Sequence, residues 1–432
     1  MKVLILTHGT RGDVQPYAAL AYALRAAGHE AVLGAPAASA SLGEPYGLPY
    51  IPLDDGPNTL IDDPDIREAI ETNYRGLRGK KIALTVIKRT KPLMAKVFAD
   101  MIAAAEGGAD VIVHPPGIPA HHIAERLGVP SVPAALQPVW VPTGTFPNPM
   151  TMSIRVPKTL NRATYLPTRL LLRSMAGTAD RMRRDLLQLP RRRRRHDVLR
   201  APGGGPVTVV QGFSRLVLPP GLDYPSWVHT TGFWYLPAAA GWTPPAELSA
   251  FLDAGEPPVY LGFGSMAGTD PHRVGRIVAE AIGLAGVRAV LVSGWGGIRL
   301  DDLPENVLLL EQIPHDWLFP RMAAIVHHGG SGTTGAALAA GRPQVVCPFV
   351  ADQPFWASRM RAMGVAPASQ PQGGLTPQGL AGAITAAVTD RRMAERAAVL
   401  GERVRAEDGV AATVGILEAV GTGRRGSRPR TW

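Results

Sequence analysis

The strongest constraint on the fold is a regular alternation of short apolar runs with segments of helical spacing. Runs of four or five apolar residues recur along the whole chain, and most are separated by stretches with apolar residues three or four positions apart. Strands that alternate with helices pair in parallel, because a parallel connection needs a crossover long enough to hold a helix. The sequence therefore predicts an α/β protein with doubly wound parallel sheets.

The alternation occurs twice. In the first half, strands are expected at 3–7, 31–34, 111–114, 131–134 and 207–211, and helices at 17–27, 92–106, 121–127 and, as one or two amphipathic helices, 166–189. In the second half, strands are expected at 259–263, 289–293, 307–310, 324–327 and 344–347, and helices at 272–284, 333–340, 354–363 and 380–389.

The length of 432 residues, against about 100–200 for one domain, also predicts two lobes. Residues 219–245 are rich in Pro, Gly and Trp, which is typical of a connection. We expect an N-terminal Rossmann-like domain at 1–218, a linker at 219–245, a C-terminal Rossmann-like domain at 246–400, and at 401–432 a helix returning to the first domain with a basic tail. Ligands should bind at the carboxyl ends of strands, in a cleft that both domains face.

The net charge of +10 is concentrated in two clusters, 181–195 and 424–430. The first contains five consecutive arginines. Two interpretations stay open: a solvated face and a disordered tail, or attraction to anionic lipid headgroups. The arginine run has no interleaved aromatic residues and no nucleic-acid-binding motif is visible, so nucleic acid is not expected as a partner.

Cys347 is the only cysteine, which excludes an intrachain disulfide and a cysteine-based zinc site. This suits a reducing compartment. The first apolar run ends at His8, too early for a signal-peptide core, and no apolar stretch is long enough to span a membrane. We expect a cytoplasmic protein; under the second of the two interpretations of the basic segments, they would make a peripheral contact with the inner face of an anionic membrane.

The most specific local pattern is a strand followed by glycines, hydroxyl residues and a helix at 325–334. Glycine lets the backbone approach a ligand closely, and the first N–H groups of a helix attract anions. This predicts a phosphate site that includes His328 and the following turn. An ordinary capped strand–helix turn has the same pattern. A P-loop is excluded because no Gly-Lys-Ser/Thr follows.

A second glycine pattern, Gly262–Gly264–Ala267, imitates a dinucleotide-binding fingerprint. An NAD(P)-dependent oxidoreductase would need an acidic residue about 20 positions on, at the end of the next strand. That strand ends in Ser293, Gly and Trp, without a carboxylate. A pyrophosphate contact by Gly264 and Ser265 explains the glycines equally well.

Several blocks follow one another along nearly the whole chain: 9–17, 109–116, 122–125, 140–143, 146–149, 262–266 and 314–354. In this order they resemble the inverting glycosyltransferases of family 1 with the two-domain GT-B fold. They look most similar to sterol glucosyltransferases and to bacterial transferases that decorate antibiotics such as macrolides. The resemblance implies transfer of a hexose, with UDP-glucose as the expected donor, to a hydroxyl of a lipophilic acceptor such as a sterol, polyketide or macrolide.

The resemblance also implies roles in the donor site. His328 and the turn after it would bind the pyrophosphate, the backbone near Gln312 would read the base, and the Asp352–Gln353 pair would hold vicinal sugar hydroxyls. Asp352 also fits a helix N-cap. The donor-binding residues that the resemblance implies are Gly12, Ser265, Trp295, Gln312, Ile313, His328, Gly330, Ser331, Gly332, Thr333, Asp352 and Gln353.

One position departs from the family pattern. Many plant members carry a ribose-binding Glu eight residues after the motif histidine, where this chain has Ala336. The base of the nucleotide is therefore not fixed as uracil by that contact. A TDP-deoxysugar used by an antibiotic glycosyltransferase is the alternative donor.

The resemblance assigns the catalytic base to Asp13, which would take the proton of the acceptor hydroxyl as it attacks the anomeric carbon. Asp13 is also a good N-cap for the next helix. A helix N-terminus lowers a carboxylate pKa, so apolar surroundings or a partner must offset that effect. We expect His114 to pair with Asp13, with His8 as a competing candidate.

The acceptor is expected on the first domain, where Trp140 and Phe146 lie in an apolar, proline-containing segment. The same segment also fits a loop buried under the domain surface. No metal is required, because backbone N–H groups and a helix N-terminus can stabilise the departing diphosphate. A non-catalytic transferase helper is disfavoured because the expected site residues are present. The Asp352–Gln353 pair disfavours a peptidoglycan-type transferase.

Overall fold

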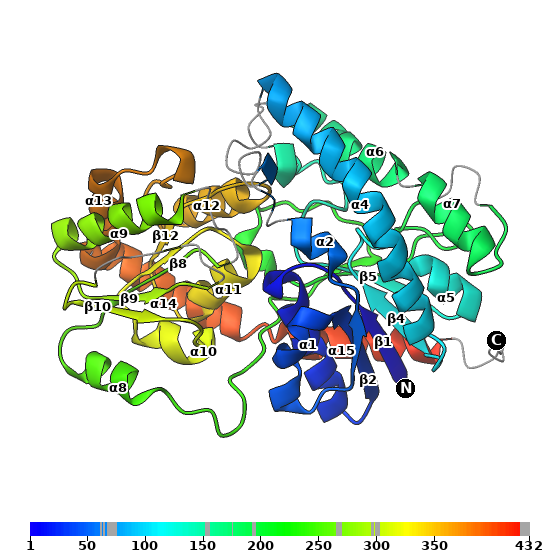
Figure 1. The fold of residues 1–432 in the computed structure, drawn as a ribbon, viewed down its shortest axis with the longest axis horizontal. Coiled ribbons are helices and arrows are strands. Elements are labelled where there is room, and N and C mark those ends of the chain that lie inside the picture. The colour runs from blue at the N-terminus through cyan, green and yellow to red at the C-terminus, as the bar shows by residue number, and fades with distance from the viewer. Residues whose placement is uncertain are drawn as a thin grey trace. The chain divides into compact units, whose positions relative to one another are not determined.

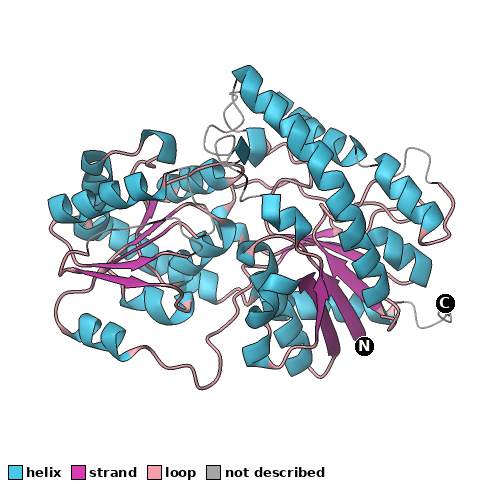
Figure 2. Ribbon diagram, in the orientation of Figure 1, coloured by secondary structure: helices cyan, strands magenta, loops and turns pink. Residues whose placement is uncertain are grey.

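Two parallel β-sheets organise the chain, one in each of two structural units (Figures 1 and 2). The computed structural model describes residues 1–60, 63, 65–66, 76–151, 156–174, 176–191, 196–264, 270–294, 298 and 303–423. The first unit comprises Met1–Leu60, Thr85–Leu236 and Glu407–Trp432, and the second comprises Ile61–Leu84 and Pro237–Ala406. The predicted α/β class is confirmed.

The first unit holds a seven-stranded parallel sheet in the order β3-β2-β1-β4-β5-β6-β7. From β1 the chain adds strands in one direction, and from β4 it adds them in the other, with Val3 beside Val111 where the two series meet. This is the switch point of a doubly wound sheet. The strands are β1 (Lys2–Leu6), β2 (Glu30–Pro36), β3 (Tyr50–Leu53), β4 (Val111–His114), β5 (Ser131–Ala135), β6 (Val209–Gln211) and β7 (Val228–Thr230).

Helices cover both faces of this sheet, as the side-chain alternation of β1 requires. Val3 and Ile5 pack with α1 (Arg11–Ala26) and α15 (Gly409–Thr422), whereas Leu4 and Leu6 pack with α5 (His121–Leu127) and the end of α4 (Gly76–Ala104). Successive residues of a strand point to opposite faces, so both faces are apolar. The remaining helices of the unit are α2 (Gly56–Thr59), α6 (Leu166–Ser174), α7 (Ala176–Asp185) and the 3-10 helices η1 (Ala37–Leu42), η2 (Glu44–Tyr46), η4 (Pro149–Thr151), η5 (Lys158–Tyr165) and η6 (Arg215–Val217).

The second unit holds a five-stranded parallel sheet in the order β10-β9-β8-β11-β12, with its switch point between β8 and β11. Apolar side chains of α9 and α13 cover one face, and those of α8, α10 and α11 the other. The strands are β8 (Val259–Gly262), β9 (Ala289–Val292), β10 (Val307–Leu310), β11 (Ile325–His327) and β12 (Gln344–Val346). The helices are α8 (Ala246–Asp253), α9 (Pro271–Ala285), α10 (His315–Leu318), α11 (Ser331–Ala339), α12 (Gln353–Ala362), α13 (Pro377–Thr389), α14 (Arg391–Arg405), η7 (Phe319–Arg321) and η8 (Gln372–Gly374).

Several expectations about the elements were wrong in an instructive way. The first helix begins at Arg11, not at residue 17, and Pro16 lies inside it. Helix α4 begins at Gly76 and runs through Pro92, which had been taken as a helix start. Strand β7 lies at residues assigned to the linker. It is only three residues long, so its pattern is too short to read from the sequence.

Candidate functional site

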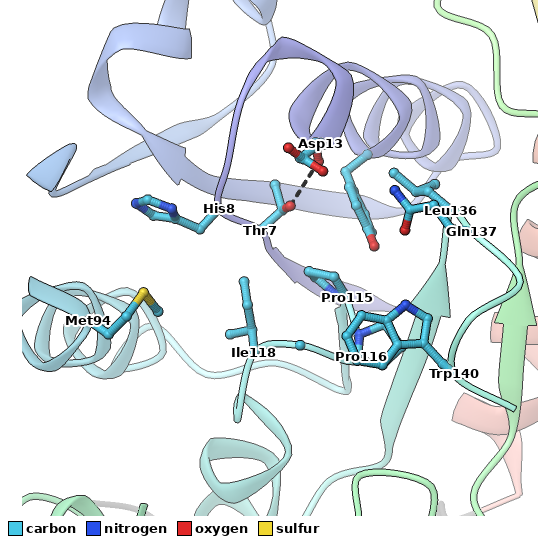
Figure 3. Close-up of a pocket in the computed structure, with 12 residues that line it drawn as sticks. Thr7, His8, Asp13, Met94, Pro115, Pro116, Ile118, Leu136, Gln137 and Trp140 are labelled. Carbon is cyan, nitrogen blue, oxygen red and sulfur yellow. Dashed lines mark hydrogen bonds between the residues drawn. The ribbon is translucent and has the colours of Figure 1, made fainter. Parts of the chain in front are cut away.

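A pocket of about 270 Å³ opens in the first unit at the carboxyl ends of β1, β4 and β5 (Figure 3). It therefore lies at the switch point of the sheet, where doubly wound folds bind ligands. Asp13 is the one carboxylate among its lining residues. These residues are Thr7, His8, Asp13, Tyr17, Met94, Pro115, Pro116, Gly117, Ile118, Leu136, Gln137 and Trp140.

Asp13 is held at the start of α1 by a capping box. Its Oδ2 atom accepts hydrogen bonds from the backbone N of Thr10 at 2.9 Å and from Thr10 Oγ1 at 3.2 Å, and Thr7 Oγ1 donates to its carbonyl oxygen at 2.9 Å (Figure 3). Thr10, not Asp13, is the N-cap residue, because the helix begins earlier than expected. The carboxylate is therefore fixed in place at the third helical position.

Gly9 makes room for this carboxylate. The residue has a φ of +137°, and a Cβ atom built on it would lie 2.4 Å from Asp13 Oδ2. Any other amino acid would displace the carboxyl group and would strain the backbone. Gly9 is thus a positioning residue, and the sequence showed it only as the first glycine of a block.

Burial raises the pKa of Asp13, and the hydrogen bonds from Thr10 and the nearby His8 only partly oppose this. The helix N-terminus was expected to lower the pKa and weaken the base. In the structure, loss of hydration outweighs the stabilising hydrogen bonds. A carboxylate with a raised pKa accepts a proton more readily than an exposed aspartate does.

The expected pair of Asp13 and His114 does not form. His114 is fully buried, and its two ring nitrogens lie 2.9 Å from the carbonyl oxygen of Pro115 and 2.9 Å from Ser131 Oγ. Burial lowers its pKa to about 4, so the ring is neutral. The carbonyl can only accept, so Nδ1 carries the proton and Nε2 accepts from the serine hydroxyl. Both nitrogens of His114 are therefore occupied, one by the loop after β4 and the other by the first residue of β5.

His8, the competing candidate, does line the pocket. Its Nε2 atom lies 2.9 Å from the carbonyl oxygen of Asp54, and that residue forms an ion pair of 2.5 Å with Lys96. A ring nitrogen facing a carbonyl must donate, so Nε2 carries the proton. His8 is consequently a second polar group of the pocket, oriented by the loop after β3.

The two residues expected to contact the acceptor, Trp140 and Phe146, have different environments in the structure. Trp140 lines the pocket, and its ring lies against Gly117, where a Cβ atom would be 3.3 Å away. Phe146 is only 4% exposed and is absent from the lining, so it serves the core. Met94 and Ile118 complete the apolar wall. They come from α4 and the loop after β4, far from Trp140 in sequence, so no local pattern could have identified them.

In the second unit, the predicted phosphate turn surrounds the imidazole of His328 with glycines. A Cβ atom on Gly330 would lie 2.5 Å from His328 Nε2, and one on Gly264 would lie 3.3 Å from its Cε1. Gly294 in turn packs its Cα side against the carbonyl of Gly264. The loops after β8, β9 and β11 thus meet closely at one edge of the sheet, which only residues without side chains permit.

His328 carries a buried polar atom with no partner in the described residues, its Nδ1. Burial lowers the pKa of the ring to about 3, with His327 and His315 adding to the effect. The ring is therefore neutral and can donate one hydrogen bond from one nitrogen. Buried polar atoms in proteins almost always have a hydrogen-bond partner, so the partner of His328 Nδ1 is a molecule other than the described chain, such as water or a ligand.

The preceding residue, His327, fixes the turn and was missed as a functional residue. Its Nδ1 accepts from the backbone N of Gly329 at 3.0 Å, and its Nε2 lies 2.9 Å from Gln344 Oε1. The pKa of this fully buried ring is lowered to about 4 by burial. The neutral ring holds Gly329 at its φ of +90° and so orients His328.

Helix α11 begins directly after this turn. Gly330 occupies the N-cap position with extended backbone and provides no side chain to cap the first turn of the helix. Gly332 is exposed and Thr333 is half-buried at the same end. The predicted residues of the turn are therefore brought together beside His328.

The Asp352–Gln353 pair begins α12, but the two side chains are partly used by the protein. Asp352 Oδ2 accepts from Trp356 Nε1 at 2.7 Å and makes no N-cap bond. Gln353 Oε1 accepts from the backbone N atoms of Phe349 at 2.7 Å and Val350 at 3.1 Å. The backbone of Gln353 lies beside Gly329, so this pair borders the same edge as His328.

Five more residues are expected at the donor site from the sequence. Ser265 and Trp295 fall outside the described residues. Gln312 is exposed just after β10, whereas Ile313 is 6% exposed and packs in the core with Leu318. Because its side chain is buried, Ile313 offers only its backbone atoms for contact with a ligand. Gly12 is exposed in the first turn of α1, in the first unit.

Two family models match the chain, one in each half. Residues 3–143 match the glycosyltransferase family 28 N-terminal domain, and residues 292–420 match the erythromycin biosynthesis protein CIII-like C-terminal domain. Each match covers one of the sheet edges just described: the first contains Asp13 and its pocket, and the second contains the His328 turn and α12.

The curated relatives span this chain almost completely. An O-mycaminosyltylonolide 6-deoxyallosyltransferase of Streptomyces fradiae is 38% identical over 97% of both chains. A sterol 3-beta-glucosyltransferase of Emericella nidulans is 33% identical over 96% of this chain, but the chain spans only 29% of that relative. Glycosyltransferase VinC, solved in complex with DTDP, has the same fold, with a TM-score of 0.63, 19% identity and coverage of 98% of this chain and 100% of the other. The chain belongs to the GT-B glycosyltransferases that include these macrolide and sterol enzymes.

Proposed function

We propose that this protein transfers a hexose from a nucleoside diphosphate sugar to a hydroxyl of a lipophilic acceptor, with inversion at the anomeric carbon. One observation carries the proposal: a buried carboxylate of raised pKa, Asp13, borders an apolar pocket at the switch point of the first sheet. Inverting transfer needs a single general base next to a bound acceptor, and this pocket supplies both.

In the proposed reaction, the acceptor lies against Trp140 and Ile118 with its hydroxyl at Asp13. The carboxylate takes the hydroxyl proton as the oxygen bonds to the anomeric carbon. The bond from that carbon to the phosphate oxygen breaks, and the nucleoside diphosphate leaves with the bonding electrons. The capping box around Asp13 keeps the carboxylate oriented, so little reorganisation is needed.

We assign the departing diphosphate to the first turn of α11 and to His328. Because His328 is neutral, its contribution is a hydrogen bond and not a charge. Backbone N–H groups at the helix start supply the remaining donors. This proposal routes no step through a metal, so activity should be retained when a chelator is added.

For the donor, UDP-glucose is the sugar nucleotide expected from the sterol-like resemblance. A TDP-deoxysugar is the second candidate, and two observations favour it. The relative matched over 97% of both chains is named for transfer of a 6-deoxy sugar. Position 336 is an alanine, which provides no carboxylate for the ribose. A macrolide-like aglycone is the acceptor that accompanies this second donor.

The test is a matrix of donors and acceptors. Purified protein is incubated with UDP-glucose or TDP-deoxysugars and with sterol, polyketide or macrolide aglycones, and products are detected by mass spectrometry. Calorimetry with UDP and TDP measures the nucleotide preference separately. Absence of binding to either nucleotide, together with absence of any glycosylated product, would refute the proposal.

We also propose a cytoplasmic location with peripheral contact to anionic membranes. Of the basic segments behind this expectation, residues 181–191 are described, whereas residues 192–195 and 424–430 lie outside the described residues. In the described part of the chain, no helix has the length and apolarity needed to cross a bilayer.

A further inference from the structure

Exposed leucines gather on one segment of the first unit. Leu160, Leu166, Leu170 and Leu171, on η5 and α6 (Figure 1), are 50–53% exposed. Met150 and Leu186, close by in sequence, are 54% and 47% exposed. Single exposed apolar residues are normal, but a concentration of large ones on consecutive helices marks an interaction surface.

The same stretch carries the positive charge of the protein. Residues 150–200 contain fourteen arginines and lysines and three aspartates, a local charge of +11 in a chain of net charge +10. Within the described residues, exposed Lys158, Arg173 and Arg181 have no acidic partner, whereas Arg162 and Arg169 pair with Asp223 and Asp197. Unpaired cations therefore lie among the exposed leucines.

Asn148 links this surface to the residue that precedes Trp140 of the pocket wall. The backbone N of Asn148 donates to Thr164 Oγ1 of η5 at 2.7 Å, and its side-chain Nδ2 donates to Thr168 Oγ1 of α6 at 3.0 Å. The same Nδ2 lies 3.2 Å from the carbonyl oxygen of Val139, next to Trp140 in the pocket wall. Asn148 is fully buried, so it fixes both helices to that wall.

We infer that the surface formed by η5 and α6, defined by Leu160, Leu166, Leu170 and Leu171 with Lys158 and Arg173, docks on a bilayer of anionic lipids. The leucines enter the boundary between headgroups and acyl chains, and the cations meet lipid phosphates. Leucines interleaved with unpaired cations have the composition of helices that lie in a membrane interface. An interface between protein chains would be depleted of unpaired lysine at its centre.

The functional consequence rests on the proposed transfer of sugar to a lipophilic acceptor. Such an acceptor partitions into the bilayer, and a helix docked there and bonded through Asn148 to the pocket wall shortens its route to Trp140. The docking itself requires no activity. Membrane binding and glycosyl transfer can therefore succeed or fail independently, and each is measured alone.

The experiment is flotation of the purified full chain with phosphatidylcholine vesicles, with and without phosphatidylglycerol. Wild type should float only with the anionic vesicles, and less so at high salt. The variant L166S/L170S/L171S should bind at least about tenfold more weakly, and K158E/R173E should lose about fivefold or more for each charge reversed. The matched control L284S/L303S removes leucines that are 57% and 49% exposed in the second unit, and it should float like wild type.

Thermal unfolding checks that the variants stay folded. Sugar transfer to a water-soluble acceptor, measured without vesicles, should be the same in the serine variant and in wild type. The inference is overturned if wild type does not float with anionic vesicles, or if the serine variant floats equally well. It is also overturned if sedimentation shows a dimer that the serine variant dissociates while vesicle binding is absent, because the surface would then be covered by a second copy.

Discussion

The two sheet edges use opposite means to prepare for a ligand. In the first unit, side chains do the work: Asp13, His8 and Trp140 project from three elements into one pocket. In the second unit, glycines shape the edge. Gly264 and Gly330 pack closely around the ring of His328, and Gly330 provides no side chain to cap the first turn of α11. One edge suits an apolar acceptor with a hydroxyl, and the other suits an anion.

Burial acts on both edges, with opposite effects on charge. It raises the pKa of Asp13 and so makes the carboxylate a stronger base. It lowers the pKa of His328 to about 3 and so keeps that ring neutral. The same loss of hydration thus tunes one group for proton transfer and the other for hydrogen bonding. The comparison predicts that the two edges will respond differently to mutation and to pH.

The largest effect is expected for Asp13→Asn. The amide keeps the shape and can still fill the capping position, but it cannot accept a proton, so kcat should fall by about 10²–10⁴-fold. Donor affinity, measured by calorimetry, should stay within about twofold, because the donor edge is untouched. Asp408→Asn is the control. Asp408 caps α15 through a bond to the backbone N of Ala411, and kcat should not change. Full turnover in Asp13→Asn would show that Asp13 is not the catalytic base.

Next in size is Gly330→Ala. The backbone of Gly330, at φ −61°, suits alanine, so the variant tests only the contact of a Cβ atom 2.5 Å from His328 Nε2. Displacing the ring should weaken donor binding by about tenfold or more while acceptor KM changes little. Gly382→Ala in α13, whose Cβ would meet nothing within 4 Å, should leave donor affinity unchanged and raise stability by up to about 1 kcal/mol. Equal donor affinities for the two variants would show that His328 does not contact the donor.

Trp140→Ala should raise the KM for the acceptor by several-fold to about tenfold, because a large apolar contact is lost. Donor affinity should be unaffected. Phe146→Leu is the informative partner, since Phe146 is buried outside the pocket. It should lower the unfolding temperature and leave the acceptor KM alone. The reverse pattern would exchange the roles assigned to these two aromatic residues.

A smaller effect is expected for Thr10→Val. The variant removes the hydroxyl that donates to Asp13 Oδ2 and lowers its pKa, so the pKa should rise further. Protonation then inactivates the base at a higher pH. The acid limb of kcat/KM should move upward by up to about one pH unit, and Thr10→Ser, which keeps the hydroxyl, should follow wild type. A shift to lower pH would contradict this role.

The smallest effect is expected for the dependence of donor affinity on pH. With a pKa of about 3, His328 takes up no proton between about pH 8 and pH 5, so donor affinity should vary by less than about twofold there. By contrast, kcat/KM should decline on the acid side as Asp13 is protonated, at a higher pH than for an exposed aspartate, because burial raises the pKa of Asp13. Calorimetry against pH distinguishes the two edges. A donor affinity that titrates near pH 6.5 would show that His328 is charged in solution.

Much of the second edge was readable from sequence, because its chemistry lies in one continuous turn. Strand, glycines and helix start are adjacent in the chain, so His328 through Thr333 could be identified together. The role of His327 was not readable, because it depends on Gln344 across the sheet. In the first unit, Asp13 was identified, but its partner was not. Where the ring nitrogens of His114 bond depends on Pro115 and Ser131.

By itself, the sequence determined the α/β class, most strands and the strand–glycine–helix turn at 325–334, because each follows from spacing along a short segment. Only the tertiary structure decided the rest. Burial raised the pKa of Asp13 in the first turn of α1, and packing brought Met94 and Ile118 beside Trp140. It also left four leucines of η5 and α6 facing solvent. These properties depend on which segments pack together. The periodicity of a sequence indicates only that a segment has an apolar face, and it does not indicate what packs against that face.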